Sequence, residues 1–245
     1  MEIKGILFDK DGTLLEFDKT WRPIANQVVA EVAKKYGIKN KEILAESIGL
    51  FSDRIDSNGS LSSGTNKDVA MDMLSIIKTS NNINKEINIE HYIKWSTELF
   101  NKVAAAFPFY PVDGVIDTIK KLKESGYNIG LSTADSVENA QLFLKKAGLD
   151  VYFDYVGADD GIINPKPAID YINTFCKLYG LRPEEIAVVG DTMTDMDFGS
   201  NGGVGLIVGV LSGTGTRSLL STKAHLVINS IKDLIVDDKV IWEDM

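Results

Sequence analysis

Hydrophobic positions after about residue 110 alternate between the spacing of an amphipathic helix and the continuous run of a buried strand. In segment 113–125 the apolar side chains fall on one stripe of a helix, and Gly126 follows as a stop signal. Apolar runs predict strands at residues 128–133, 155–158, 186–190, 204–210 and 225–228, and helical patterns cover residues 135–147, 167–179 and 195–200. Strands that alternate with helices predict an α/β fold with a parallel sheet covered by helices on both faces.

Residues 18–107 follow a different pattern. Helical spacing recurs near residues 20–36, 40–51, 66–79 and 88–105, and no convincing strand separates these segments. We therefore expect an inserted all-helical domain, with residues 1–17 and 108–245 forming the α/β core. Such an insert would stand above the carboxyl ends of the strands, as a lid does.

The first strand is predicted at residues 3–8, and two carboxylates follow it, Asp9 and Asp11. Carboxyl ends of strands are the ligand-binding edge of open α/β sheets. Neighbouring carboxylates repel each other unless a cation or a proton lies between them. Gly12 and Thr13 come next, and Asp, Gly and Thr are also ordinary turn residues. Taken alone, the segment fits a polar turn nearly as well as a functional site.

Further polar residues follow the ends of later strands. Thr133 comes at a predicted helix start, where it could bind an anion or cap the helix, and Asp135 with Glu138 resembles a capping pair. Lys166 stands between two prolines, which would aim its side chain, although most lysines are solvated surface residues. Asp191 follows a fully apolar strand, and Asp195 lies four residues later, where it could also be a favourable first-turn acid.

These groups converge on a single edge of the predicted sheet. Uncompensated, such a cluster of acids would cost several kcal/mol. A hard divalent cation removes that cost, and Mg²⁺ takes carboxylate oxygens together with a substrate phosphate. Lys166 and Thr133 would then bind the remaining phosphoryl oxygens. Such a site provides the positioning and charge neutralisation that phosphoryl transfer needs. An aspartate can also act as the nucleophile and form an acyl phosphate.

This constellation resembles the haloacid dehalogenase (HAD) superfamily of phosphotransferases over essentially the whole chain. Asp9-Lys10-Asp11-Gly12-Thr13 matches the first motif of that family, Thr133 the second, Lys166 the third and Gly190-Asp191-x-x-x-Asp195 the fourth. The resemblance implies a Rossmann-like HAD core, and the helical insert looks like the C1 cap of the phosphoglycolate-phosphatase-like branch.

The resemblance also implies roles for the matched residues. Asp9 would be the nucleophile and a Mg²⁺ ligand. Asp11 would protonate the leaving oxygen and then activate water, and its backbone carbonyl would touch the metal. Asp191 would be a side-chain ligand and Asp195 a direct or an outer one. Two positions depart from the usual pattern: Lys10 replaces an apolar residue, and Ala134 stands where many relatives carry Asn.

Composition narrows the function classes. The chain has 245 residues and a formal net charge of −9, which argues against a nucleic-acid or acidic-membrane partner. No apolar run approaches the roughly 20 residues of a membrane helix, and charged residues interrupt the first apolar run where a signal peptide would lie. Cys176, the sole cysteine, lies at apolar helical spacing, so we expect a core residue and a cytoplasmic protein.

We therefore expect a Mg²⁺-dependent phosphatase that hydrolyses a small, phosphoglycolate-like phosphomonoester through an aspartyl-phosphate. Two alternatives stay open, a phosphomutase of the β-phosphoglucomutase type and a non-catalytic phosphate-binding protein on the same scaffold. Arg22, Arg54 and His91 are polar candidates for reading the leaving group, against a role in packing. The glycine-rich segment 199–215 does not have the spacing of a P-loop, so we expect tight turns there. The sequence carries no signal for the identity of the ester or for oligomeric state.

Overall fold

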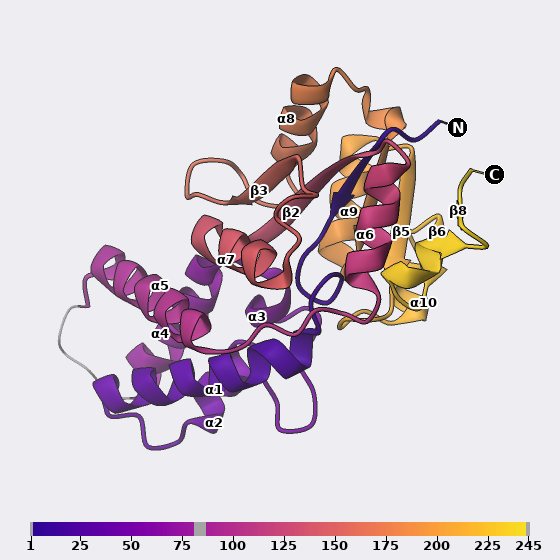
Figure 1. The fold of residues 1–245 in the computed structure, drawn as a ribbon. Coiled ribbons are helices and arrows are strands. Elements are labelled where there is room, and N and C mark those ends of the chain that lie inside the picture. Colours follow the sequence, from indigo (N-terminus) through magenta and orange to yellow (C-terminus); the bar gives the residue numbers. More distant parts are fainter. Residues whose placement is uncertain (1, 81–86, 244–245) are drawn as a thin grey trace. The chain divides into compact units, whose positions relative to one another are not determined.

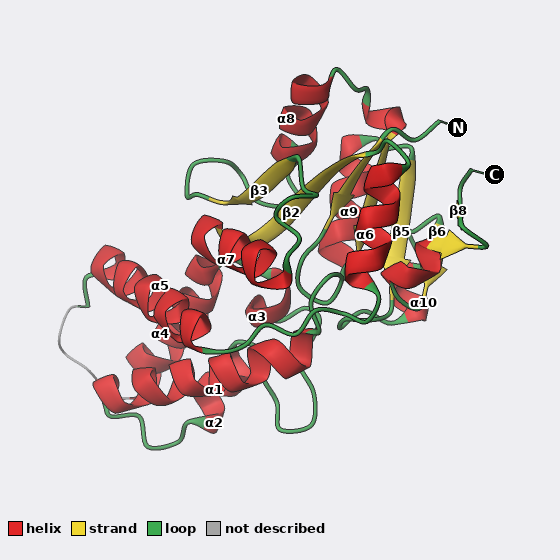
Figure 2. Ribbon diagram, in the orientation of Figure 1, coloured by secondary structure: helices red, strands yellow, loops and turns green. Residues whose placement is uncertain are grey.

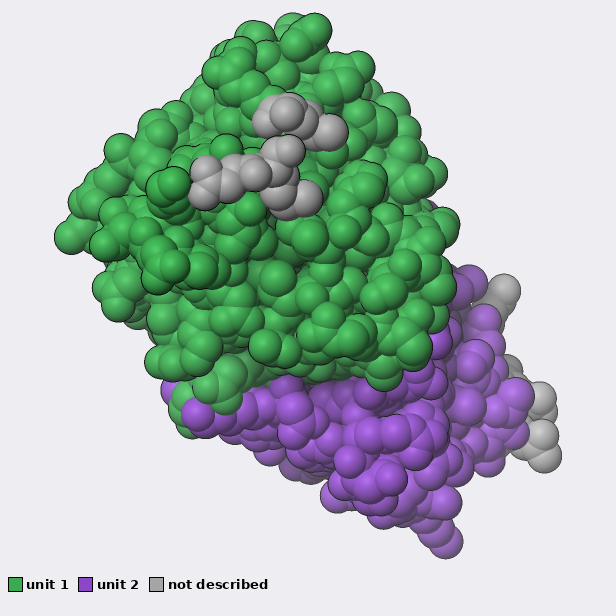
Figure 3. All heavy atoms as spheres, turned by 90° about the vertical axis from the view of Figure 1, so that its right-hand side faces the viewer, with its two compact units in different colours: residues 1–17, 109–245 green, residues 18–108 purple. Residues whose placement is uncertain are grey.

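The computed structural model describes residues 2–80 and 87–243. The chain divides into two compact units, coloured green and purple in Figure 3. The first comprises Met1–Phe17 with Phe109–Met245, and the second comprises Asp18–Pro108. The second unit is thus an insertion into the first, immediately after the segment that follows the opening strand.

The first unit is built on a six-stranded parallel sheet, which confirms the predicted α/β fold class. Its strands are β1 (Gly5–Phe8), β2 (Asn128–Ser136), β3 (Tyr155–Asp159), β4 (Ile186–Gly190), β5 (Leu206–Val210) and β6 (Leu226–Ile228). Their order across the sheet is β3-β2-β1-β4-β5-β6. The opening strand therefore lies in the middle, with β2 on one side and β4 on the other, and every residue of β1 and β4 is buried. Continuous apolar runs are what a strand covered on both faces requires.

Helices cover both faces of this sheet (Figure 2). They are α6 (Val115–Glu124), α7 (Val137–Ala147), α8 (Asp170–Tyr179), α9 (Met193–Gly202) and α10 (Arg217–Leu220), and a hairpin of β7 (Ile235–Val236) and β8 (Lys239–Val240) follows β6. On one face, Leu7 and Val188 from the strands pack with Phe175 from α8 and Phe198 from α9 in a fully buried cluster. Cys176 packs against this cluster but is only partly buried, so it lies at the margin of the core and not inside it as expected.

The second unit consists of helices, with no strand among its described residues (Figure 1). They are α1 (Phe17–Tyr36), whose first residue belongs to the other unit, α2 (Glu42–Ser47), α3 (Ser60–Ser63), α4 (Asn66–Ser80) and α5 (Ile89–Ala106). Ile24, Met73 and Phe100 are fully or almost fully buried, and the ring of Trp21 lies 6.5 Å from that of Phe100. The unit therefore has its own hydrophobic core. None of the described helices is both long enough and apolar enough to cross a membrane.

The predicted start of the helix after β2 is wrong. Asp135 is not its capping residue, because β2 continues through Ser136. Ser136 is the N-cap of α7, and its side-chain oxygen accepts the N–H of Asn139 at 3.3 Å. Serine is among the preferred N-cap residues, so the local competition between Asp135 and Ser136 is decided by where the strand ends. The carboxylate of Asp135 is thereby left for other contacts.

Candidate active site

The carboxyl ends of β1 and β4 bring two aspartates to one edge of the sheet. Phe8 is in register with Val189, and the N–H of Asp9 donates to the carbonyl of Val189 at 2.8 Å. Asp9 therefore follows β1 directly, and Asp191 follows the neighbouring β4 directly. One carboxylate oxygen from each of Asp9, Asp191 and Asp195 lies within 4.8 Å of the other two, and all three residues are buried. The structure therefore brings these three acids together, as expected from the sequence.

Asp195 takes part in a helix cap and in the carboxylate cluster at the same time. Thr192 is the N-cap of α9, and one oxygen of Asp195 accepts the backbone N–H of Thr192 at 3.0 Å and its hydroxyl at 2.7 Å. This capping box fixes the carboxylate. The other oxygen accepts a hydrogen bond from Lys166 at 2.5 Å. The two roles left open by the sequence are therefore compatible.

Lys166 is buried in the cluster, which rules out the solvated surface lysine. Its ammonium group donates to Asp9 at 2.7 Å as well as to Asp195, and its side chain is 4% exposed. A buried charge is tolerated when it is paired. Burial alone would lower the pKa of Lys166, but the attraction of Asp195 and Asp9 outweighs it and raises that pKa. The lysine is therefore held as a cation beside Asp9.

One lysine does not balance three buried carboxylates. Burial, with the repulsion of Asp195 and Asp11, raises the pKa of Asp9 to about 7, although Lys166 opposes this. Burial and the charges of Asp9 and Asp195 raise the pKa of Asp191 well above its usual range. Excess negative charge on hard oxygen donors is what a divalent cation such as Mg²⁺ neutralises.

Asp191 has one bonded and one unpartnered carboxylate oxygen. Its Oδ2 atom accepts the backbone N–H of Thr214 at 2.7 Å. Its Oδ1 atom is buried and has no hydrogen-bond partner among the residues that the structure describes. A buried polar atom without a partner is costly and needs an explanation. The three carboxylates therefore fit a hard divalent cation, with Asp191 Oδ1 as one available ligand atom.

Asp11 lies at the edge of this cluster, and its side chain does not belong to the group of three. Its carboxylate is 15% exposed, and its Oδ2 atom lies 3.1 Å from the ammonium group of Lys10. Gly12 then turns the chain at a φ of +90°, and a Cβ atom there would lie 2.5 Å from the carboxylate of Asp191. Glycine at this position thus satisfies both the positive φ and the close approach.

Thr133 lies in β2, the strand beside β1. Leu131 is in register with Phe8, so Thr133 reaches the same sheet edge as Asp9. It is 1% exposed, and its hydroxyl oxygen accepts the N–H of Asp135 at 3.1 Å. Because Ser136 caps α7, Thr133 is not the helix cap that the sequence left open.

Two groups of contacts at this edge were not foreseen from the sequence. One joins Lys10 to Asp135, which are 125 positions apart. The other is the loop after β5, where a Cβ atom on Gly213 would lie 1.9 Å from the carboxylate of Asp191. The glycine-rich segment therefore does more than allow turns, because it lets the backbone pack against an acid of the cluster. The sequence signal for this contact was that the glycine-rich loop directly follows a predicted strand, as the other site residues do.

The two arginines among the polar candidates contact groups within the helical unit. Arg22 donates to the carbonyl of Phe51 at 2.7 Å and to Asp18 at 2.6 Å. The guanidinium of Arg54 lies over the ring of Phe51, 4.4 Å from its centre. Contacts with a leaving group stay a prediction for these arginines.

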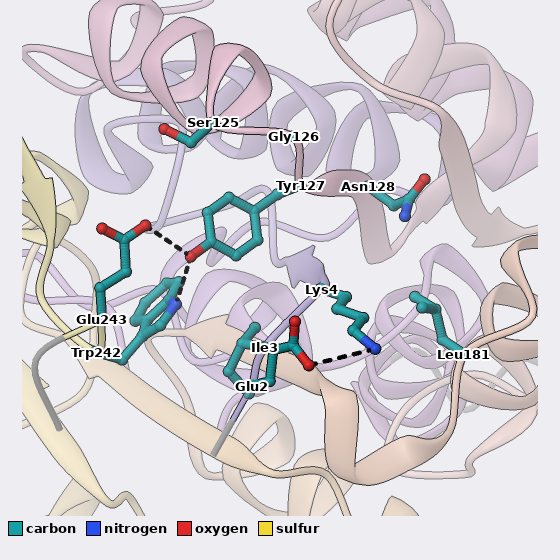
Figure 4. Close-up of a pocket in the computed structure, with 10 residues that line it drawn as sticks. All are labelled: Glu2, Ile3, Lys4, Ser125, Gly126, Tyr127, Asn128, Leu181, Trp242 and Glu243. Carbon is teal, nitrogen blue, oxygen red and sulfur yellow. Dashed lines mark hydrogen bonds and ion pairs between the residues drawn. The ribbon is translucent and has the colours of Figure 1, made fainter.

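A hollow of about 660 Å³ lies at the opposite end of the strands, near the amino ends of β1 and β2 (Figure 4). Its lining includes Lys4, Tyr127 and Trp242, and the Tyr127 hydroxyl accepts the indole N–H of Trp242 at 3.1 Å. No sequence-predicted site residue lines it. This hollow therefore lies apart from the predicted catalytic residues.

Comparisons with known proteins agree with this geometry. The model of the haloacid dehalogenase-like hydrolases matches residues 3–203. The pyrophosphatase PpaX of Halalkalibacterium halodurans is 32% identical over 125 residues, which cover 51% of this chain and 58% of that protein. PpaX of Bacillus mycoides is 30% identical over 49% of this chain and 56% of its own length. The chain therefore matches little more than half the length of these curated relatives.

Solved structures share the fold over nearly the whole chain. A predicted phosphoglycolate phosphatase from Haemophilus somnus has a TM-score of 0.74 at 18% identity and covers 96% of this chain and 97% of its own. CbbY from Rhodobacter sphaeroides, solved in complex with phosphate, has a TM-score of 0.70 at 18% identity, covering 95% and 96%. With the four motifs at the carboxyl edge of the sheet and a family model that spans most of its length, the chain belongs to the haloacid dehalogenase-like hydrolases.

Proposed function

We propose that this protein is a Mg²⁺-dependent phosphatase that hydrolyses a small phosphorylated metabolite through an aspartyl-phosphate on Asp9. The observation that carries the proposal is the buried cluster of Asp9, Asp191 and Asp195, with Lys166 bonded to its first and last members. Membership in a hydrolase family supports the reaction class.

In this proposal the side chains of Asp9, Asp191 and Asp195 and the backbone carbonyl of Asp11 hold the metal. When bound, Mg²⁺ supplies positive charge that neutralises the phosphoryl oxygens in the transition state. The unpartnered Oδ1 atom of Asp191 supports this assignment, because it has a lone pair to offer and no protein donor among the described residues.

The remaining steps belong to the protein's own residues. Lys166 and Thr133 bind phosphoryl oxygens, and Lys166 also orients the carboxylate of Asp9 for in-line attack on phosphorus. As the bond to the leaving oxygen breaks, Asp11 gives that oxygen a proton. Asp11 then takes a proton from water, which attacks the phosphorus of the aspartyl-phosphate and releases phosphate and free Asp9.

We further propose that residues 18–108 act as the cap and that they contain the groups that select the leaving group. The names of similar proteins, a pyrophosphatase and a phosphoglycolate phosphatase, suggest compact anionic substrates. The formal charge of −9 opposes such anions at long range, so local cations must bind them.

A substrate screen tests the proposal. The purified protein is incubated with phosphoglycolate, sugar phosphates, nucleotides and pyrophosphate, with Mg²⁺ or with excess chelator, and released phosphate is measured. We expect Mg²⁺-dependent release from at least one small ester and no release with chelator. Isomerisation of a sugar phosphate without phosphate release would favour the phosphomutase. Phosphate binding without turnover of any ester would favour the non-catalytic alternative.

A further inference from the structure

Lys10 is a fully buried lysine between the two aspartates of the first motif. Its exposure is 0%, and Lys10 and Lys166 are the buried lysines of the described chain. Burying an ammonium group is costly unless charges and hydrogen bonds compensate it. An apolar side chain would fill this position without that cost. The lysine therefore needs a reason that packing alone does not give.

The surroundings of Lys10 hold its ammonium group between two carboxylates. It donates a hydrogen bond to Oδ2 of Asp135 and lies 3.1 Å from Oδ2 of Asp11. The rings of Phe109 and Phe143 lie 5.9 and 6.0 Å from the ammonium group, within the range of cation–π attraction. The charge is therefore confined to one place beside Asp11.

Asp135 is anchored in turn by the start of α7. Its other oxygen accepts the backbone N–H of Ser136 at 2.7 Å and the side-chain amide of Asn139 at 3.0 Å. Its own N–H donates to the hydroxyl oxygen of Thr133 at 3.1 Å. A continuous set of contacts thus leads from a helix terminus through Asp135 and Lys10 to Asp11.

We propose that Lys10 and Asp135 form a brace that holds the carboxylate of Asp11 in place for proton transfer to the leaving oxygen. Lys166 bonds to Asp9, and Lys10 bonds to Asp11, so each aspartate of the first motif has its own buried lysine. Asp11 is the more exposed of the pair, and its side chain lies outside the carboxylate cluster. The carboxylate of Asp11 therefore depends more than that of Asp9 on a neighbour that fixes its position. This inference rests on the proposed function.

The test distinguishes an effect on the position of the Asp11 carboxylate from an effect on the stability of the fold. Release of the first leaving group is measured in single turnovers with Mg²⁺ for two substrates. Nitrophenolate departs from p-nitrophenyl phosphate without needing a proton, whereas the alkoxide of an alkyl phosphate needs one. The variants are Lys10→Met and Asp135→Asn, and Lys123→Met is the matched control because Lys123 pairs with Asp154 away from the site.

We expect each brace variant to release the alkyl group at least about 30-fold more slowly and nitrophenolate less than about 3-fold more slowly, because only the first reaction uses the general acid. The control should match the wild type with both. Equal losses with both substrates, or no loss, would overturn the brace. Failure of both variants to fold would also overturn it, since the pair would then serve stability. If the wild type cleaves no phosphate ester with Mg²⁺, either here or in the substrate screen, the proposed function itself fails.

Discussion

Lys166 donates a hydrogen bond of 2.7 Å to Asp9, although the two residues lie 157 positions apart in the sequence. The same ammonium group bonds to Asp195 at 2.5 Å, so a single lysine joins the end of β1 to the start of α9. This arrangement makes the lysine part of the fold as well as part of the site.

Replacing Lys166 should therefore affect both stability and activity. Lys166→Met leaves two buried carboxylates without their cation, and removing one partner of a buried ion pair costs about 3–5 kcal/mol. We expect a lower denaturation midpoint in chelator and a smaller deficit in Mg²⁺, with the rate on an aryl phosphate at least about 100-fold lower. Lys123→Met, which breaks a partly exposed pair with Asp154, is the control. An active, fully stable Lys166→Met protein would contradict the assignment.

The proposed metal-binding role of Asp191 can be tested without an activity assay. In Asp191→Asn the buried charge next to Asp9 and Asp195 is removed, so we expect the metal-free protein to be at least as stable as the wild type. Mg²⁺ at about 100 times its dissociation constant should stabilise the wild type by roughly 2.7 kcal/mol and the variant far less. Thermal unfolding with and without Mg²⁺ measures both effects. Asp197→Asn, which removes a partly exposed acid on α9, should respond like the wild type.

The loop after β5 should control the position of Asp191. The added methyl group of Gly213→Ala would lie 1.9 Å from the Asp191 carboxylate, so that acid or the loop must move. We expect weaker Mg²⁺ stabilisation and at least about a tenfold loss of turnover, since displaced groups are costly in a positioned site. Gly161→Ala has open space but a φ of +72°. It should cost about 1 kcal/mol of stability and keep the full Mg²⁺ response; equal responses in both variants would refute the role of the loop.

A surface ion pair away from the site should give a pH-dependent stability. Hydrogen bonds from Lys4 and from the backbone and side chain of Arg182 lower the pKa of Glu185 to about 2. A carboxylate with a lowered pKa stabilises the fold above its unfolded pKa of about 4.3, and that stabilisation is lost as pH falls toward 2. The free energy of unfolding of Glu185→Gln should therefore be lower than that of the wild type at neutral pH. The difference should shrink as the pH falls. A pH-independent difference in denaturant midpoint would contradict this.

The sequence predicted the parts of the site that depend on strand ends. Asp9 and Asp191 each follow an apolar run, and parallel neighbours put such residues at one edge whatever the details of packing. Lys166 could be identified from its family motif. Its burial between Asp9 and Asp195 could not be predicted, because it depends on the tertiary fold.

The missed contacts depend on tertiary packing that no local pattern encodes. Lys10 contacts Asp135 in the last part of β2, beyond the expected end of that strand. The capping pattern at Asp135 had pointed to a helix start instead. The contact of Gly213 with Asp191 likewise joins a loop to a neighbouring strand. The predictions at these positions rested on local sequence patterns. The structure there is determined by long-range contacts instead.

The proposed covalent mechanism requires that Asp9 attacks phosphorus. The most direct measurement is the Mg²⁺-dependent turnover of a generic aryl phosphate by Asp9→Asn, with circular dichroism to verify the fold and Asp113→Asn, an exposed acid, as the control. We predict that Asp9→Asn folds like the wild type and has no measurable turnover, while the control is fully active. Undiminished turnover in folded Asp9→Asn would contradict the covalent mechanism.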